Sequence, residues 1–393
     1  MSKLITWVIV IVVLIIGGFA IFGGPSGEAS TIKIGVIMPL TGDAVQYGEA
    51  ANKAIQVAID AVNKMGGIHG EDEGDVGREI ELIIEDGKCD PQAAGTAAKK
   101  LVEFDKVRII IGGACSGETL AAAKITEPAK VVLISPASSS PDVTDAGDFV
   151  FRTYPSDALS GRISASYAIN ELEAETAAIF TELTDYAQGL REVFKKSFED
   201  LGGTIVADET YSTGDIDFKT QILKIKQTNP DVIYIAPQTS TPGIAIIKQL
   251  KENGVKSQFM TAEVLISDRE FVKENADVLE GLIGVEPAVD WENNPKAKAL
   301  LDAHNEKFGA DPGPFAANAY DAALLVVEAL ETLVSPGSVE FSAEEVRDFL
   351  YNVKNWPGAV GPLTLDENGD PVLGENVRKI ADGEVVDLGP YTP

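Results

Sequence analysis

The sequence predicts an α/β protein of two similar lobes, each built on a doubly wound, mostly parallel sheet, behind an N-terminal transmembrane helix. Three observations support this fold class. Short apolar strands alternate with helix-periodic stretches, the alternation restarts near residue 151, and residues 4–22 form one uncharged apolar run. With 393 residues, 45% of them hydrophobic, the chain is long enough for two cores.

The apolar run at 4–22 is long enough to cross a membrane. As a helix it would measure roughly 28 Å, about the thickness of one hydrocarbon core. Lys3 precedes it, which places the chain after residue 23 on the outer side. A cleaved signal is the alternative, but its apolar stretch is usually shorter, and the one exit site is a weak candidate near Ala29. Residues 1–30 are therefore predicted to be a membrane anchor or signal segment with a linker.

The first part of the exported chain alternates strands and helices. Strands are predicted at 32–38, 81–86, 107–113 and 131–135, and helices at 48–63, 91–104 and 117–127. After residue 151 the alternation repeats, with strands at 177–180, 204–211 and 231–237 and helices at 188–201 and 218–228. Two runs of one pattern indicate two similar lobes.

Beyond Gly281 the pattern changes. Two helices are predicted at 295–308 and 315–333, followed by a tail with the hairpin dipeptides Asn368-Gly369 and Asp382-Gly383, which indicate antiparallel strands. Because these helices could cover either lobe, we expect more than one crossing between lobes. The predicted division gives 31–153 and 286–360 to lobe 1, and 154–285 and the tail 361–393 to lobe 2.

Charge and cysteine content narrow the possible partners and the compartment. A formal net charge of −29 would repel polyphosphate, so no nucleic-acid partner is expected, and the acidity is ascribed to a solvated surface. Cys89 and Cys115, expected in loops after adjacent strands, favour one disulfide in an oxidising compartment, which would stabilise the fold by about 3.5 kcal/mol. Two buried free thiols are the alternative.

Ligands of open α/β sheets bind beyond the carboxyl ends of the strands, where this chain has loops rich in Ser, Thr, Gly, Tyr and Gln. Ser116 begins a helix, so its hydroxyl and free N–H groups could bind a carboxylate, and Ser138 and Ser139 come from the neighbouring strand end. Glu263 follows another strand and could bind an ammonium across the cleft. Helix capping, turn formation and a surface glutamate are the structural alternatives.

Catalytic signatures are absent from the sequence. His69 and His304 are the only histidines, and neither stands in a metal-binding spacing. The chain has no nucleophile elbow, P-loop or dinucleotide fingerprint, and Cys115 has too few bases to act as a nucleophile. We therefore expect binding without turnover, with neither cofactor nor metal.

Long stretches of the chain follow a known family pattern from about residue 31 to 388. They include IKIGVIMPLTGDAVQYGEAANKA, CSGETLAAA, ISPASSSPDVTD, FVFRTYPSD, YAQGLREVFKKSFEDLGG and AYDAALLVVEAL. In these stretches the sequence resembles the periplasmic leucine/isoleucine/valine-binding family, the type I solute receptors of branched-chain amino-acid ABC transporters. The resemblance implies the two-lobed type I periplasmic-binding-protein fold.

The resemblance also implies a ligand site. Ser116, Ala137 and Ser139 would bind the ligand's α-carboxylate and help to hold its ammonium, which Glu263 would neutralise. The expected ligand-binding residues are Tyr47, Ala114, Cys115, Ser116, Ala137, Ser138, Ser139, Tyr186, Gln238, Glu263 and Phe315, with a Cys89–Cys115 disulfide beside them. The chain departs from the family at Gln238 and Thr239, in PQTSTPG, at an acidic insertion within 67–80, and in its anchor-like N-terminus.

The expected function is extracytoplasmic binding of an amino-acid-like solute, branched-chain-like or related, for an ABC permease. The lobes would close about a hinge around the ligand. A monomer is expected on the outer face of the cytoplasmic membrane, held by the N-terminal helix, or secreted if that segment is cleaved. The alternative function is a ligand-sensing ectodomain that acts with a signalling partner.

Overall fold

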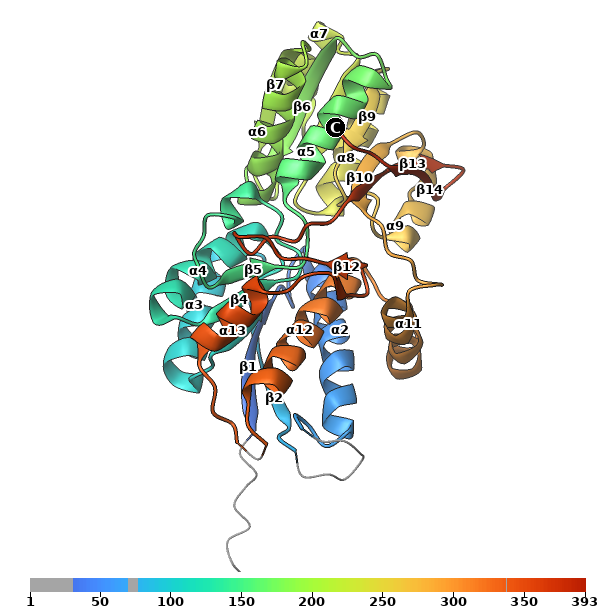
Figure 1. The fold of residues 1–393 in the computed structure, drawn as a ribbon. Coiled ribbons are helices and arrows are strands. Elements are labelled where there is room, and N and C mark those ends of the chain that lie inside the picture. Colours follow the sequence, from blue (N-terminus) through green and yellow to red (C-terminus); the bar gives the residue numbers. More distant parts are fainter. Residues whose placement is uncertain (1–30, 70–76, 337) are drawn as a thin grey trace, which may run out of the picture.

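A computed structural model shows two α/β lobes, one above the other, each with helices on the faces of a sheet (Figure 1). The structure describes residues 31–69, 77–336 and 338–393. Lobe 1, the lower one in Figure 1, contains the beginning of the described chain, and lobe 2 lies above it. This arrangement confirms the type I periplasmic-binding-protein fold that the resemblance implies.

Lobe 1 is built on a parallel sheet of order β2-β1-β3-β4-β5. Its strands are β1 (Ile32–Met38), β2 (Ile80–Asp86), β3 (Ile109–Gly112), β4 (Val132–Ser135) and β5 (Val150–Arg152). The helices between them are α2 (Val45–Lys64), α3 (Pro91–Lys100), with the π-helical turn η1 (Leu101–Asp105), α4 (Ser116–Ala129) and the 3-10 turn η2 (Pro141–Val143). β3 and β4 are buried along their whole length, as expected of parallel strands covered by helices on both faces.

Lobe 2 repeats this strand order as β7-β6-β8-β9-β10, which confirms that the two lobes are similar. Its strands are β6 (Thr176–Glu182), β7 (Thr204–Tyr211), β8 (Val232–Ala236), β9 (Gln258–Thr261) and β10 (Ile283–Pro287), extended by β13 (Glu375–Ala381) and β14 (Glu384–Pro390). Its helices are α5 (Asp157–Asn170), α6 (Asp185–Asp200), α7 (Lys219–Thr228), α8 (Ser240–Glu252), α9 (Arg269–Glu274) and α10 (Ala276–Leu279). β13 and β14 are antiparallel and joined at Asp382-Gly383, as predicted.

The late helices pack on lobe 1, and the last strands complete the sheet of lobe 2. Their bounds are α11 (Pro295–Phe308), α12 (Ala316–Leu333) and α13 (Ala343–Tyr351), followed by the short strands β11 (Trp356–Pro357) and β12 (Pro362–Leu363). Residues of these helices share the core that α2 and β1 form. The described chain therefore crosses between the lobes near 153–156, 288–294 and 366–374.

A buried ion pair joins two of these crossings on the lobe 1 side. Arg152, at the end of β5, is fully buried, and its Nε and Nη2 donate to the two carboxylate oxygens of Asp370 at 2.6 and 2.7 Å. The same guanidinium donates from Nη1 to the carbonyl oxygens of Ser138 and Ser140. Because every nitrogen of the side chain has an acceptor, the pair escapes the large penalty of an uncompensated buried charge.

Five helices of the described chain were not predicted: α5, α8, α13 and the short α9 and α10. α5 is surrounded by protein on most sides and consists largely of small residues, among them Ser160, Gly161, Ser164 and Ala165, so it has no apolar stripe that would reveal a helix. α8 begins inside the loop predicted at PQTSTPG, where Ser240 is its first residue. α13 starts at a capping box formed by Ser342 and Glu345, which was the sequence signal available for it.

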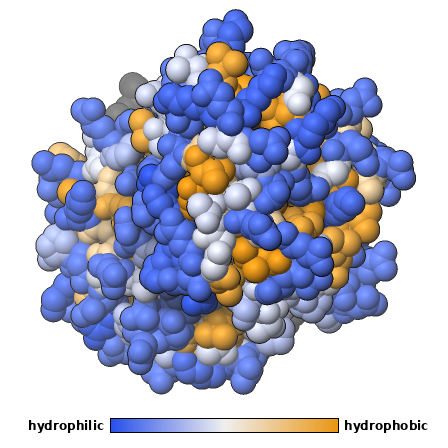
Figure 2. Space-filling view, turned by 90° about the horizontal axis from the view of Figure 1, so that it is seen from above, coloured by the Kyte–Doolittle hydropathy of each residue, from blue (hydrophilic) through white to orange (hydrophobic). Residues whose placement is uncertain are grey.

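The predicted membrane helix at 4–22 and most of the acidic insertion lie outside the described residues. Within 31–69, 77–336 and 338–393, no helix combines the length and the apolar character that a membrane span requires. Figure 2, viewed from above, shows a mostly hydrophilic face on which hydrophobic residues form separate patches. This agrees with the solvated surface inferred from the charge of −29.

Candidate ligand-binding site

A small cavity lies between the lobes, at the carboxyl ends of the parallel strands. It is lined by Tyr47, Ala114, Cys115, Ser116, Ala137, Tyr186, Gln238, Glu263, Val264 and Phe315. Every residue predicted for the ligand site lines it except Ser138 and Ser139. Val264 was not predicted, although it directly follows Glu263 in the same loop. The structure thus brings together loops from both halves of the chain, as the rule for open sheets requires.

The cavity is narrow because the lobes are close together. The space between its walls, including solvent at the mouth, is about 330 Å³, and the centre of a water molecule fits within only about 20 Å³. The hydroxyls of Tyr47 in lobe 1 and Ser240 in lobe 2 lie 3.0 Å apart in a buried hydrogen bond across the cleft. Burial raises the pKa of Tyr47 to about 12, so this hydroxyl keeps its proton at neutral pH. The structure therefore represents a closed arrangement of the lobes.

Lobe 1 contributes neutral hydrogen-bond donors at the start of α4. The N–H groups of Glu118 and Thr119 donate to the carbonyl oxygen of Cys115. Those of Ser116 and Gly117, the first two of the helix, have no intrahelical acceptor because they lie in its first turn. The Ser116 hydroxyl accepts a hydrogen bond from Ser140 N at 3.1 Å, which fixes it beside the cavity. A helix N-terminus with free N–H groups favours an anion.

Glu118 fixes the loop that presents these donors, and sequence reasoning missed it. Its carboxylate accepts hydrogen bonds from the N–H groups of Cys89, Ala114 and Cys115 at 2.9, 3.0 and 3.0 Å. Burial raises the pKa of Glu118 to about 7 in spite of these bonds. An added Cβ at Gly113 would come within 2.4 Å of the Glu118 side chain, so this close approach requires glycine.

Cys89 and Cys115 form a disulfide with a Cα–Cα distance of 5.3 Å, which confirms the predicted bond and shows that the free-thiol alternative is wrong. The expectation that the two loops follow adjacent strands is wrong, because β1 lies between β2 and β3 in the sheet. The bond therefore spans the end of β1 and joins the two loops at one wall of the cavity. Cys115 lines the cavity, whereas Cys89 does not.

The two predicted serines outside the lining differ in their partners. The Ser138 hydroxyl bonds to Thr119 Oγ1 at 2.7 Å and lies within 3.3 Å of the carbonyl oxygens of Gly113 and Ala114. It therefore belongs to the internal framework of the loop. The Ser139 hydroxyl is buried and has no hydrogen-bond partner of standard geometry.

Lobe 2 contributes a buried carboxylate opposite these donors. Glu263 is 3% exposed and follows β9. Burial raises the pKa of Glu263 to about 7, although the nearby Tyr186 hydroxyl lowers that pKa. That hydroxyl nevertheless makes no hydrogen bond of standard geometry. Among the described residues no Lys, Arg or His forms an ion pair with Glu263, so its negative charge has no cationic partner there.

Aromatic rings close the apolar side of the cavity. The Phe315 ring packs edge-on against the rings of Tyr47 and Tyr154, with centroid distances of 5.5 and 5.3 Å. Phe315 has a φ of +62°, an uncommon conformation for an aromatic residue that holds its ring at the start of α12. Phe315 also lines a wider opening between the lobes, beside Trp291 and Pro314.

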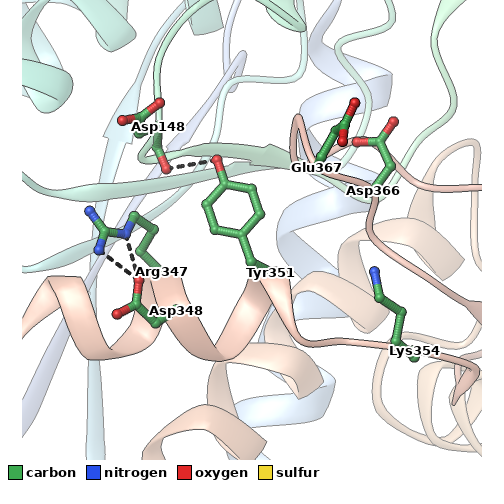
Figure 3. A pocket seen from close by; sticks show the side chains of 7 residues that line it. All are labelled: Asp148, Arg347, Asp348, Tyr351, Lys354, Asp366 and Glu367. Carbon is green, nitrogen blue, oxygen red and sulfur yellow. Dashed lines mark hydrogen bonds and ion pairs between the residues drawn. The ribbon is translucent and has the colours of Figure 1, made fainter.

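Another pocket lies on the outer surface of lobe 1, beside α13 (Figure 3). Its wall combines Arg347 and Lys354 with several acidic residues, and Arg347 pairs with Asp348 within the wall. Tyr351 donates to the carbonyl oxygen of Asp148, so it does not point freely into the pocket. Groups of His, Cys, Asp and Glu that could hold a metal ion do not occur within the described parts of the chain. The cavity between the lobes is therefore the candidate site.

Comparison with known proteins shows the family of the chain. A family model described as periplasmic binding protein matches residues 31–380. The leucine-, isoleucine-, valine-, threonine- and alanine-binding protein of Pseudomonas aeruginosa is 30% identical over 90% of each chain. The Leu/Ile/Val-binding protein of Escherichia coli is 27% identical over 91% of this chain and 92% of its own.

Solved structures give the same result. The leucine-binding protein LivK of Thermotoga maritima superposes with a TM-score of 0.81 at 30% identity, covering 92% of this chain and 99% of its own. The substrate-binding protein LivJ of Streptococcus pneumoniae, in complex with isoleucine, gives 0.81 at 29% identity over 93% and 100%. A benzoate complex of an ABC-transporter solute-binding protein from R. palustris also reaches 0.81, but at 22% identity it shows the fold alone.

These proteins bind solutes and are not enzymes, which confirms the prediction of binding without turnover. The family match covers both lobes and both walls of the cavity. The chain therefore belongs to the periplasmic binding protein family and is related, over nearly its whole length, to the leucine/isoleucine/valine-binding proteins.

Proposed function

We propose that this protein binds a small α-amino acid between its lobes and delivers it to an ABC permease. The observation that carries the proposal is the unpaired, buried carboxylate of Glu263, which lines one cavity together with Ser116 at the start of α4. A zwitterion matches this arrangement: its carboxylate takes the neutral donors of lobe 1, and its ammonium takes the carboxylate of lobe 2.

The walls favour a short apolar side chain. Tyr47, Tyr186 and Phe315 surround a space with little free volume, so a bulky substituent would hold the lobes apart. The relatives named for leucine, isoleucine, valine, threonine and alanine support a ligand of this size. Structures of related fold hold benzoates, which makes an aromatic acid the competing ligand class.

Binding operates through closure of the lobes. The two halves of the site belong to different lobes, so a ligand contacts both only in the closed state and shifts the population toward it. A closed receptor presents a shape to the permease that the open one lacks. Relatives described as transporter substrate-binding proteins support delivery to a permease over the sensory alternative.

A thermal-shift screen tests the ligand class. The purified full-length protein is heated with each of the twenty common amino acids, with benzoate and with buffer alone. An amino acid at 100 times its dissociation constant stabilises the protein by about 2.7 kcal/mol, and we expect small apolar ones to act most strongly. A shift with benzoate and with no amino acid would overturn the proposal.

We further propose that the N-terminal segment remains on the mature protein and holds it, as a monomer, at the outer face of the membrane. The run at 4–22 is longer than the apolar region of a typical signal, and no strong exit site follows it. Intact-mass measurement of membrane-extracted protein should therefore give the mass of the uncleaved chain. A new N-terminus between Gly24 and Thr31 would contradict retention.

A further inference from the structure

Two loops of lobe 1 that meet at one wall of the ligand cavity are joined twice. The loop after β2 carries Cys89, and the loop after β3 carries Ala114 and Cys115. The Cys89–Cys115 disulfide is the covalent link. The Glu118 carboxylate is the second link, because Oε1 accepts the N–H of Cys89 while Oε2 accepts those of Ala114 and Cys115. Both links therefore span the same pair of loops.

The two loops pack closely around the Glu118 side chain, which is fully buried. An added Cβ at Gly87, in the loop after β2, would come within 2.2 Å of Glu118 Oε1. An added Cβ at Gly113, in the loop after β3, would come within 2.4 Å of Glu118 Cβ. Both positions therefore need glycine while the carboxylate stays in place. The carboxylate is enclosed by the loops that it joins.

This junction supports the lobe 1 wall of the cavity. Residues 114–116 line the cavity, and the last of them begins α4. The Gly113 carbonyl oxygen, in the same loop, accepts hydrogen bonds from the hydroxyls of Ser135 and Ser138 at 2.6 and 3.2 Å. The loop after β4 is thereby tied to the same junction. A shift of the loop after β3 would therefore displace the start of α4 and the loop after β4 together.

The junction needs a carboxylate at position 118. Both oxygens of a carboxylate accept hydrogen bonds, one toward each loop, whereas the amide of glutamine has one oxygen and one NH₂ group. Whichever way that amide turns, its NH₂ group faces the N–H donors of one loop, and the link between the loops is broken. Glutamine keeps the size and shape of the side chain, so Glu118→Gln removes the link without leaving a cavity.

We propose that Glu118 is a positioning residue for the groups that bind the ligand's carboxylate, and that Glu118 and the disulfide are parallel links, either of which alone keeps the cavity wall in place. The affinity part of the inference rests on the proposed amino-acid function. Ligand binding by this chain is therefore insensitive to the redox state of its surroundings as long as Glu118 is present. Loss of both links lets the loop after β2 separate from the start of α4.

Reduction of the disulfide in full-length wild type and in Glu118→Gln tests the proposal. Dithiothreitol supplies two electrons and two protons, so that Cys89 and Cys115 become thiols while the reagent closes to its cyclic disulfide. Thiol labelling checks that both cysteines are free. The measurements are made at about pH 8, where the Glu118 carboxyl, whose pKa burial raises to about 7, is largely ionised.

Calorimetry gives the affinity for L-leucine, or for whichever amino acid the screen shows to bind best. We expect reduction to weaken binding to wild type by less than about threefold, and oxidised Glu118→Gln to bind within about fivefold of wild type. Reduced Glu118→Gln should bind at least about thirtyfold more weakly than wild type, because the effects of losing parallel links are not additive. The amide of the same amino acid, which has no carboxylate, should lose less affinity than the amino acid does.

Hydrogen exchange gives a readout that needs no ligand. The amides of 87–90 and 113–116 should stay protected in reduced wild type and exchange at least about tenfold faster in reduced Glu118→Gln. The amides of β6 and β8, in lobe 2, should exchange equally slowly in both samples. If these also lose protection, the two links hold the whole fold together instead of the cavity wall, and the proposal is overturned.

Glu127→Gln is the matched control. Glu127 lies near the other end of α4, and its two oxygens accept the N–H groups of Asp148 and Phe149 at 3.1 and 3.0 Å, away from the cavity. This variant should bind as wild type does in both redox states. The parallel links are refuted if reduced wild type loses as much affinity as reduced Glu118→Gln, or if reduced Glu118→Gln keeps its affinity. A wild-type protein that binds no amino acid refutes the proposed function instead, and the exchange measurement still tests the links.

Discussion

Replacing Glu263 with glutamine is expected to weaken amino-acid binding at least about thirtyfold. Removing one partner of a desolvated charge pair costs about 2 to 5 kcal/mol, because the ligand's ammonium is left buried without its anion. Glu263 forms no ion pair with any residue that the structure describes, so we expect its role in the ligand-free fold to be small. The melting temperature of ligand-free Glu263→Gln should therefore equal that of wild type or exceed it.

Titration calorimetry and thermal melting of the same samples check this prediction. Ser116→Ala is the comparison, with an expected loss of about 1 to 2 kcal/mol, since backbone N–H groups at the start of α4 remain in place. An unchanged affinity in Glu263→Gln would show that the ligand has no ammonium or binds elsewhere. A large fall in melting temperature would instead assign Glu263 to the fold.

Replacing Gly189 with alanine is expected to weaken binding about five- to 150-fold while stabilising the ligand-free protein. Gly189 lies in α6 of lobe 2, and an added Cβ would come within 2.7 Å of Pro141 Cδ in lobe 1. Neither a proline ring nor a helix backbone yields easily, so the clash opposes closure by about 1 to 3 kcal/mol. In the open state Gly189 and Pro141 separate, so the clash disappears. There alanine stabilises α6 by about 1 kcal/mol relative to glycine.

Gly95→Ala is the matched control for this variant. Gly95 also lies in a helix, α3, but an added Cβ there would meet nothing closer than the Ala121 carbonyl oxygen at 4.0 Å. It should raise the melting temperature without changing the affinity. Small-angle scattering should show that saturating ligand compacts Gly95→Ala more fully than Gly189→Ala. Equal affinity and compaction in the two variants would mean that closure does not bring α6 against Pro141.

The alternating pattern predicted most of the fold because each strand is a short apolar run bounded by turn residues. β1 and α11 match their predicted ranges, since β1 is a short apolar run and α11 starts at Pro295 and ends before Gly309. α5 escaped prediction because burial on most of its faces removes the polar side that periodicity needs. The position of β1 between β2 and β3 depends on strand pairing, which local sequence does not encode.

The candidate site was predictable where residue type and loop position agree. Ser116, Tyr186 and Glu263 lie at strand or helix ends and line the cavity. Glu118 was missed because it looks in sequence like an ordinary acid in the first turn of a helix, where acids are common. Its burial and its three N–H donors distinguish it, and these arise only when the loops of lobe 1 are folded together.

The Arg152–Asp370 ion pair also determines where the chain bends. It anchors the first and third crossings to lobe 1, and Thr153 is held there as well by reciprocal hydrogen bonds with Asn318. On the far side, Glu375 is already bonded to Ser160 of lobe 2. Val372 N–H also donates to the Thr364 carbonyl oxygen at 2.8 Å, so the third crossing is held to lobe 1 as far as that residue. We therefore expect lobe rotation to bend these two crossings at 154–156 and 373–374, with the pivot axis on the lobe 2 side of the buried guanidinium.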